Sequence, residues 1–242
     1  MKILKTGLLA ATALFSTILV QAQTADEIIS KHISAIGGKE KVSQIKSLYM
    51  EGAVDLMGNQ APITSYILNG KGYKSEMEFN GQKIVNAMNE KGGWMINPMM
   101  GSSAPQPLPA EQFNASKDQM VIGGALLDYQ AHGNKAELVG KEKVANADAY
   151  KIKLSTKEQD TTTYFIDANT YYLVKVVKVA NMGGQEAEVE ISFSDYKKTD
   201  YGFTMPYKTE VALPQGFSLA TTFKKVEVNK EIDPKIFEMP AN

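Results

Sequence analysis

The sequence predicts a mainly β protein with helices (α+β), built on a single, strongly curved antiparallel sheet. Apolar and polar residues alternate with a period of two along most of the chain, which is typical of strands with one buried and one wet face. Turn signals recur about every ten residues, as in an antiparallel meander. Helical patterns are confined to the N-terminal region, residues 23–45, and to an insertion at residues 97–130.

The first 22 residues predict an export signal. Lys2 and Lys5 precede an apolar run over residues 8–20, and small residues stand before an expected cleavage point after Ala22. The run is too short and too near the start to favour a permanent membrane span. We therefore expect an exported, soluble and monomeric protein, with one domain over residues 23–242.

Charge and composition exclude several kinds of site. All 26 basic residues are lysine, against 27 acidic residues, and cysteine is absent. Cleavage after Ala22 leaves 24 lysines and a net charge of −3, so charge gives no reason to bind nucleic acid. Without cysteine there is no disulfide framework, thiolate metal site or lipid-modified cysteine. Without arginine, a dedicated phosphate site is less expected.

Two short helices are predicted at the start of the mature chain. Residues 24–27 (Thr-Ala-Asp-Glu) form a capping box, and isoleucines follow at helical spacing until Gly37-Gly38 ends the helix. Residues 39–45 predict a second helix. We expect both helices to cover one end or face of the sheet.

The strand meander begins at Lys46. Its turn signals are Gly58-Asn59, Asn69-Gly70, Asn80-Gly81 and Gly92-Gly93. Asn followed by Gly is a strong signal for a two-residue hairpin, because both residues tolerate the left-handed backbone conformation.

The clearest hairpin lies in residues 148–180, where two β-rich runs flank the turn Asp167–Thr170. On the returning strand Lys175 and Lys178 fall on opposite faces, which predicts either a β-bulge or a lysine stem lying across apolar surface. Residues 187–193 alternate most cleanly, with Ala, Val, Ile and Phe predicted to face inward.

The meander is interrupted in mid-chain. Residues 97–109 are rich in proline, so we expect irregular structure there. Residues 110–130 read as helical, with a break at Gly123-Gly124. Together they predict a helical lid that covers the concave face of the curved sheet and hinges at the two glycines.

Five stretches together resemble the LolA/LolB-like family of outer membrane lipoprotein-sorting, or lipoprotein-carrier, proteins. They are IGGKEK from Ile36 leading into IKSL, LVGKEKVANADAYKIKL from Leu138, TTYFIDANTYYLVK from Thr162, MPYKTEV from Met205 and VEVNKEIDPKIFEMP from Val226. The resemblance implies a half-barrel, an unclosed antiparallel sheet whose apolar concave face is covered by helices and accepts acyl chains. Family members use a strand arginine to bond the lid, and this chain has no arginine.

The sequence offers no pattern of an enzyme. The two histidines, His32 and His132, lie far apart and are predicted to be a packing residue and a loop residue. The carboxylates are scattered along wet strand faces, where they serve as solubilising charge rather than as a metal site. We therefore expect no catalytic residue, no metal and no cofactor.

The candidate ligand-binding residues are apolar side chains around the lid. Methionines gather between the fourth strand and the lid, and methionine adapts to irregular apolar partners. The alternative is that the same side chains form ordinary core. The candidate set comprises Met77, Phe79, Trp94, Met99, Met100, Phe113, Met120, Ile122, Leu126 and Leu127.

Two classes of function remain open. The first is a periplasmic carrier or binding protein for acyl chains of lipoproteins or another hydrophobic ligand. The second is an envelope protein-interaction or sensor domain with a filled core, whose partner is a membrane protein of the envelope. A cavity of several hundred cubic ångströms favours the first class. A packed interior with an exposed apolar patch favours the second.

Overall fold

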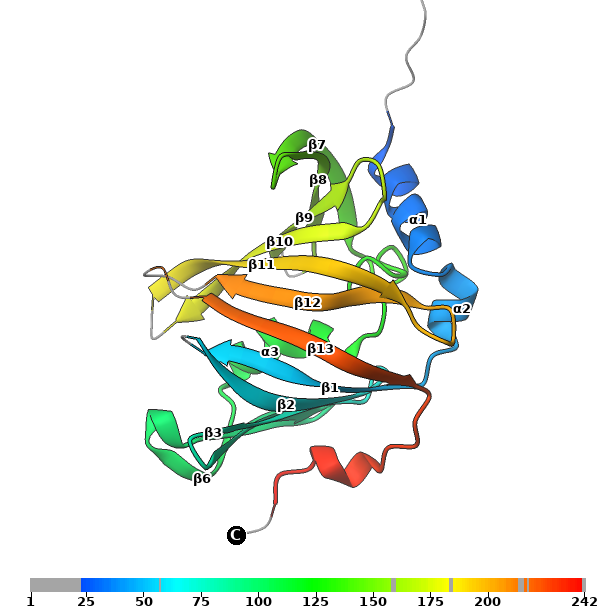
Figure 1. The fold of residues 1–242 in the computed structure, drawn as a ribbon. Helices are drawn as coiled ribbons and strands as arrows, with labels where there is room; N and C mark the ends of the chain where they lie inside the picture. The colour runs from blue at the N-terminus through cyan, green and yellow to red at the C-terminus, as the bar shows by residue number, and fades with distance from the viewer. Residues whose placement is uncertain are drawn as a thin grey trace, which may run out of the picture.

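The computed structural model of the protein describes residues 23–56, 58–157, 160–182, 185–212, 216 and 218–240. Their strands form one 13-stranded antiparallel sheet, in the order β6-β5-β4-β3-β2-β1-β13-β12-β11-β10-β9-β8-β7. The sheet curves and stays unclosed, with β6 and β7 as its two edges (Figure 1). The predicted mainly β, antiparallel fold is confirmed, while the expected export signal lies outside the described residues.

Strands make up most of the described chain. They are β1 (Ser47–Leu56), β2 (Asn59–Leu68), β3 (Gly72–Phe79), β4 (Gln82–Asn89), β5 (Gly92–Asn97), β6 (Ser102–Pro107), β7 (Lys135–Val144), β8 (Ala147–Ser155), β9 (Thr161–Asp167), β10 (Leu173–Met182), β11 (Gln185–Lys198), β12 (Thr204–Ala212) and β13 (Ser218–Val228). The described helices are α1 (Ala25–Ala35), α2 (Lys39–Ser43) and α3 (Ala110–Ser116), with 3₁₀ turns η1 (Pro98–Met100), η2 (Lys117–Met120) and η4 (Pro234–Phe237).

The path of the chain explains why the sheet has a covered concave side. Strands β1 to β6 step outward from the middle of the sheet to one edge, and β7 to β13 step inward from the other edge until β13 pairs with β1. The chain between the two edges, residues 108–134, therefore has to cross from one side of the half-barrel to the other. Figure 1 shows α3 of this crossing behind the central strands, with α1 and α2 along one end of the sheet.

Local sequence signals set the predicted turns and the first helix. Asn80 and Gly81 have φ values of 51° and 72°, which is the left-handed pair that a two-residue hairpin requires. At the start of α1, the Glu27 N–H donates to Thr24 Oγ1 (3.2 Å) and the Thr24 N–H donates to Glu27 Oε2 (3.1 Å). The capping box is confirmed. Helix α2 ends at Ser43, two residues before the predicted end.

The mid-chain prediction is wrong in two respects. Residues 102–107 form the edge strand β6, because an edge strand pairs on one side only and so tolerates Pro105 and Pro107. Residues 110–130 were predicted to form two helical pieces that meet at Gly123-Gly124; the first forms as α3 and η2, whereas turns replace the second. Gly123, Gly124 and Asp128 have φ values of 94°, 75° and 56°, which a right-handed helix cannot contain.

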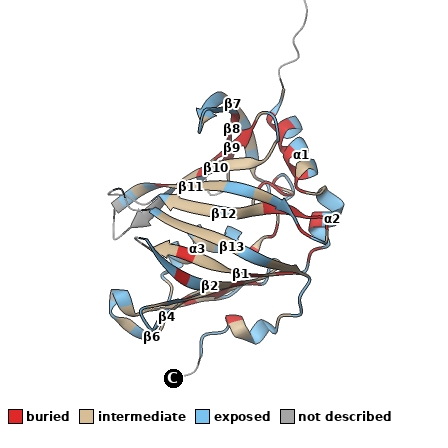
Figure 2. Ribbon diagram, viewed as in Figure 1, coloured by how far each residue is buried: buried red, intermediate tan, exposed pale blue. Residues whose placement is uncertain are grey.

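The main core lies where α1, residues 122–129 and the β7–β10 half of the sheet meet, and Figure 2 shows buried residues on the inner sides of these elements. Ile28, Ile152 and Ile166 are fully buried there. A smaller cluster of buried residues, Val85, Ala87 and Trp94, lies on β4 and β5 in the other half of the sheet. No helix in the described ranges is long and apolar enough to cross a membrane.

Candidate functional site: a concave apolar cavity

A cavity of about 530 Å³ lies between the concave face of the sheet and residues 118–125. Strands from both halves of the sheet line it, and so do α1 and the chain that follows η2. Most of the lining side chains are apolar. They include Ile36, Leu48, Met50, Ile63, Ile67, Val121, Ile122, Leu173, Val176, Ile191, Phe193, Phe203, Met205, Val211 and Phe223. The volume is in the range of about 300–1,000 Å³ that is usual for small-molecule sites.

Several polar side chains also face this cavity. Tyr73 and Ser65 lie on neighbouring strands, and Thr209 and Thr221 are directly opposite each other on β12 and β13. Burial raises the pKa of the Tyr73 phenol above its usual value, so the group stays protonated. The cavity therefore combines a mainly apolar wall with scattered hydroxyl groups.

A bulge in β10 decides which side chains of this strand reach the cavity. The pairing of β10 with β9 shifts register between Leu173 and Lys175, before both lysines, and the pairing with β11 is regular from Lys175 onward. The two lysines therefore stay on opposite faces, and the Lys178 stem lies against the apolar cavity wall, as the second sequence interpretation predicted. The bulge brings Leu173 to the same face, so Leu173, Val176 and Lys178 all line the cavity. Lys175 lies on the other face, with its Nζ 4.4 Å from the centre of the Phe165 ring.

Lys178 is the one lysine among the described cavity-lining residues. Its Nζ donates a hydrogen bond to the carbonyl oxygen of Ala115 in α3, at 2.9 Å. Burial lowers the pKa of the Lys178 ammonium, and the nearby Asp118 carboxylate acts in the opposite direction. This contact connects the sheet to the segment that covers it.

We call residues 110–133 the cover segment. At the β2–β3 turn, the Gly70 N–H donates to the Met120 carbonyl (2.8 Å), and Asn69 Oδ1 accepts from the Ile122 N–H (3.0 Å). The Asn69 side-chain amide also donates to the Ile45 carbonyl at 2.9 Å. A single side chain therefore joins the cover segment to the chain that enters β1.

The other end of the cover segment is held by α1 and α2. Tyr129 donates a hydrogen bond to Asp26, and Gln130 Nε2 donates to the same carboxylate at 3.2 Å. Lys39 forms an ion pair with Asp128. Outside this junction is a second groove of about 460 Å³, lined by α1 and residues 126–131, in which polar and charged groups are as frequent as apolar ones.

His32 forms part of the cavity wall and is only 4% exposed. Its Nδ1 lies 2.9 Å from the Tyr171 carbonyl oxygen, so a neutral imidazole has its proton on Nδ1 and donates it to that oxygen. Burial lowers the pKa of His32 below its usual value, although the carbonyl hydrogen bond opposes the shift. In the described part of the chain, no group of three or more His, Asp or Glu side chains could hold a metal ion.

The predicted ligand-binding residues of the cover segment are divided between several environments. Ile122 lines the cavity, whereas Leu126 and Leu127 line the outer groove and are buried in the main core. Met120 is buried, and its carbonyl accepts the Gly70 hydrogen bond. Phe113 is half-buried beside Lys117, whose Nζ lies 5.2 Å from the ring centre.

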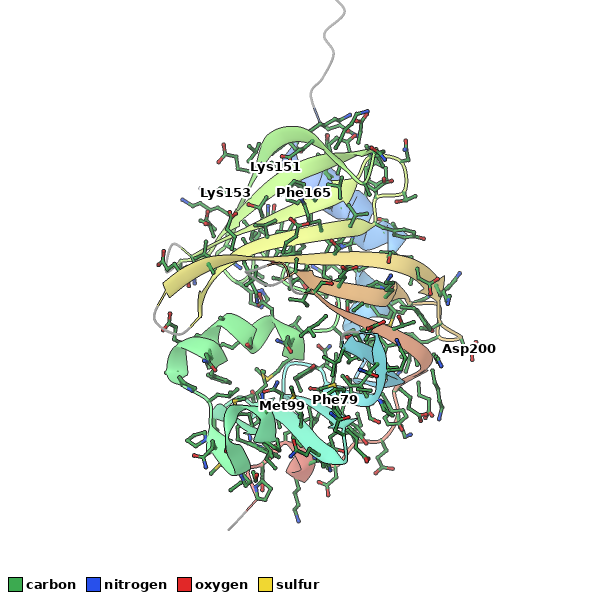
Figure 3. All side chains as sticks on the ribbon, turned by 60° about the vertical axis from the view of Figure 1, so that its left-hand side comes forward. Phe79, Met99, Lys151, Lys153, Phe165 and Asp200 are labelled. Carbon is green, nitrogen blue, oxygen red and sulfur yellow. The ribbon has the colours of Figure 1, made fainter. Side chains whose placement is uncertain are left out.

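The predicted residues from the strands lie in the other half of the sheet. Trp94 belongs to the smaller core cluster, and its indole N–H donates to the Phe237 carbonyl at 3.0 Å. Met77 and Phe79 are half-buried on β3, and Met99 is 64% exposed. Figure 3 labels Phe79 and Met99 at the lower end of the view, away from Phe165 on β9. The side chain of Met100 lies outside the described residues.

Of the ten predicted residues, the structure therefore places Ile122 on the wall of the cavity. Most of the wall comes from strands that the ligand-site prediction left out, namely β1, β2 and β10 to β13. The signal for them was present in the alternating pattern. Ile191 and Phe193 were predicted to face inward, and both line the cavity.

Comparison with known proteins identifies the fold. A LolA superfamily protein from Nitrosomonas europaea superposes with a TM-score of 0.59 at 14% identity, over 90% of this chain and 98% of that chain. A DUF1329 family protein from Desulfovibrio piger gives 0.58 at 15% identity, over 88% and 97% of the two chains. A Vibrio parahaemolyticus domain, described as outer membrane lipoprotein-sorting, gives 0.55 at 14% identity, over 87% and 94%.

These similarities show that the chain has the LolA-like fold, so the resemblance noted in the sequence is confirmed at the level of the fold. No family model matches the sequence. No curated protein matches it either.

Proposed function

We propose that the protein is an exported carrier or binding protein for acyl chains, either those of lipoproteins or those of another hydrophobic ligand. The observation that carries this proposal is the cavity of about 530 Å³ between the concave sheet and the cover segment. An apolar chain that enters such a cavity gains roughly 0.8 kcal/mol for each methylene group removed from water.

The construction of the cavity also supports a binding role. Its wall comes from strands of both halves of the sheet, and its cover is held mainly by individual side chains, among them Asn69 and Lys178. Each of these hydrogen bonds contributes about 0.5–1.5 kcal/mol net, and the buried side chains of Met120, Ile122 and Leu126 also hold the cover in place. Binding, rather than catalysis, is the role that this arrangement favours.

The fold gives general support for the same role. The Vibrio parahaemolyticus domain with this fold is described as outer membrane lipoprotein-sorting. By analogy with that domain, we propose a periplasmic location for the present protein, with a hydrophobic ligand or a lipid-modified protein as its partner.

The test is displacement of a neutral fluorescent probe, 1-N-phenylnaphthylamine, from delipidated protein by alkanols of increasing chain length. We expect the probe to bind and the alkanols to displace it more strongly as the chain grows. Thr221→Trp adds a large side chain on β13 inside the cavity, and should weaken probe binding by about tenfold, since the indole takes up space that the ligand would occupy.

Thr222→Trp is the matched control, because residue 222 is the next position on β13 and its side chain points to the opposite face. Probe affinity should stay within about twofold of the parent protein for this variant. Equal effects of the two substitutions, or no probe binding by the parent protein, would contradict the proposal. The protein-interaction function would then be the better explanation.

A further inference from the structure

We propose that the cavity selects amphiphiles with one acyl chain and an anionic head group, a carboxylate or a phosphate, and that Lys178 binds this head group. The inference rests on the proposed binding function and adds the chemical class of the ligand. It follows from the charge of Lys178, the hydrogen-bond donors that its contacts with the described residues leave free, and the difference in polarity between the two ends of the cavity.

The positive charge of Lys178 at one end of the cavity is unusual for a mainly apolar binding site. Lys178 is half-buried and is the one lysine among the described lining residues. A lysine stem turned toward an apolar interior is unfavourable unless its ammonium has partners. Lys175, three residues earlier on the same strand, lies on the outer face beside Glu190. Because Lys175 and Lys178 lie on opposite faces of β10, this strand has a single lysine on the ligand side.

The ammonium of Lys178 has capacity for a ligand. An ammonium carries three N–H donors, and the described residues provide one acceptor at hydrogen-bond distance, the Ala115 carbonyl oxygen at 2.9 Å. Two donors remain for oxygens of a carboxylate or phosphate. Charge-assisted hydrogen bonds of this kind are about twice as strong as neutral ones.

The two ends of the cavity differ in polarity, which gives the ligand a direction. Near α1 and α2, the wall consists mainly of apolar side chains that are nearly fully buried, such as Ile36, Leu48 and Phe203, together with the buried imidazole of His32. At the other end, Lys178 stands beside Asp118 and Gln119, whose side chains are exposed. An acyl chain therefore fits with its tail toward α1 and its head at Lys178, next to solvent.

The Asp118 carboxylate limits how much negative charge the head group can carry. Its carboxylate lines the same end and acts on the Lys178 ammonium, so the two side chains together present little net charge. A second negative charge on the ligand would be repelled by Asp118. The site is thus suited to a singly charged head group, and removing the Asp118 charge should strengthen anion binding.

The experiment compares ligands of equal chain length as competitors for the neutral probe. Laurate and dodecanol are titrated against 1-N-phenylnaphthylamine bound to the full protein. We expect laurate to bind about tenfold more tightly than dodecanol, the effect of one charge-assisted hydrogen bond. Lys178→Gln should bring the ratio of the two affinities close to one, whereas Lys175→Gln on the outer face should leave the ratio as in the parent protein.

Asp118→Asn provides an independent measurement, since this exposed side chain can change without disturbing the fold. The preference for laurate should rise in this variant. A laurate-to-dodecanol ratio of one in the parent protein, or an unchanged ratio in Lys178→Gln, would overturn the inference. Probe binding itself reports on the cavity, so these outcomes are distinguishable from a failure of the proposed function.

Two further competitors identify the source of the head group. Lysophosphatidate and lysophosphatidylcholine have the same chain and phosphate, but the second carries a cationic choline that cancels the charge. Tighter binding of laurate than of lysophosphatidate would indicate free fatty acids. Tighter binding of lysophosphatidate would indicate an anionic phospholipid product, and would show that Asp118 does not repel a second negative charge.

Discussion

Strand β10 shows how one inserted residue changes which side chains of a strand face a cavity. In the sequence, Lys175 and Lys178 fall on opposite faces of the strand, so one of them interrupts the alternation of apolar and polar residues. Two explanations were considered, a β-bulge or a lysine stem that lies across apolar surface. The bulge lies between Leu173 and Lys175, before both lysines, so it brings Leu173 to the same face as Val176 and Lys178 while Lys175 stays on the other face. The position of the bulge depends on pairing with β9, and therefore could not be read from β10 alone.

A second residue-scale feature, the burial of His32, predicts acid sensitivity. Burial lowers the pKa of His32 below its usual value of 6.5, so the fold favours the neutral imidazole. This contribution to stability is fully present above about pH 6.5 and is lost as the pH falls below that value, because the unfolded chain takes up the proton first.

Urea denaturation at pH 7.5 and at pH 5 measures this effect. His32→Asn retains a donor for the Tyr171 carbonyl but cannot take up a proton, so the variant should lose less stability on acidification than the parent protein. Equal losses in the two proteins would show that His32 does not contribute to the acid response.

At the scale of elements, alternation and turn chemistry predicted most of the sheet. The segments they missed are those in which a tertiary contact overrides a local preference. Strand β6 forms despite Pro105 and Pro107, because it pairs with the free edge of β5. Of the two helical pieces predicted over residues 110–130, the second does not form, because residues 123, 124 and 128 adopt left-handed backbone conformations as the chain turns back toward α1.

Two isoleucines on neighbouring elements separate packed core from cavity wall. Ile152 on β8 is fully buried, and Ile152→Ala should cost about 2–5 kcal/mol of unfolding free energy. Ile191 on β11 is half-buried and already borders empty space, so Ile191→Ala removes fewer packing contacts and should cost clearly less.

Chemical denaturation of both variants measures the difference, with Glu190→Ala as an exposed-face control for β11. Saturation with laurate should raise the stability of the parent protein. Equal losses from the two isoleucine variants would mean that the space beside Ile191 is filled in solution.

At the scale of the whole molecule, the half-barrel was anticipated through the resemblance to a family and not through periodicity. A period of two shows that a segment is a strand and which face is apolar, but it does not show which strand is its neighbour. The pairing of β1 with β13 joins residues about as far apart as the described chain allows, for example Leu48 with Val228. The cavity depends on that pairing, which is why its wall was missed.

This central pairing contains a close approach that can be tested. At the irregularity in the β1–β13 pairing, a Cβ atom on Gly52 would lie 2.2 Å from the Thr222 carbonyl oxygen. Gly52→Ala must push the two strands apart, and should cost about 1–3 kcal/mol or more. At Gly92 on β5 a Cβ would have no neighbour within 4 Å, so Gly92→Ala is the matched control.

Thermal and chemical unfolding of the two variants give the comparison. Because β1 and β13 join the two halves of the sheet, Gly52→Ala should also weaken probe binding in the cavity. If Gly52→Ala were as stable as Gly92→Ala, the close contact between β1 and β13 would not exist in solution.

The open shape of the sheet also has a consequence for self-association. An unclosed sheet offers two edges to which a second chain could add a strand, and repeated addition leads to aggregates. On β6, Pro105 and Pro107 have no N–H to offer such a strand. On β7, the exposed lysines 135, 141 and 143 and the register shift at Leu138 and Gly140 make the edge charged and irregular. The protein can therefore keep its half-barrel open to ligands without offering either edge as a template for polymerisation.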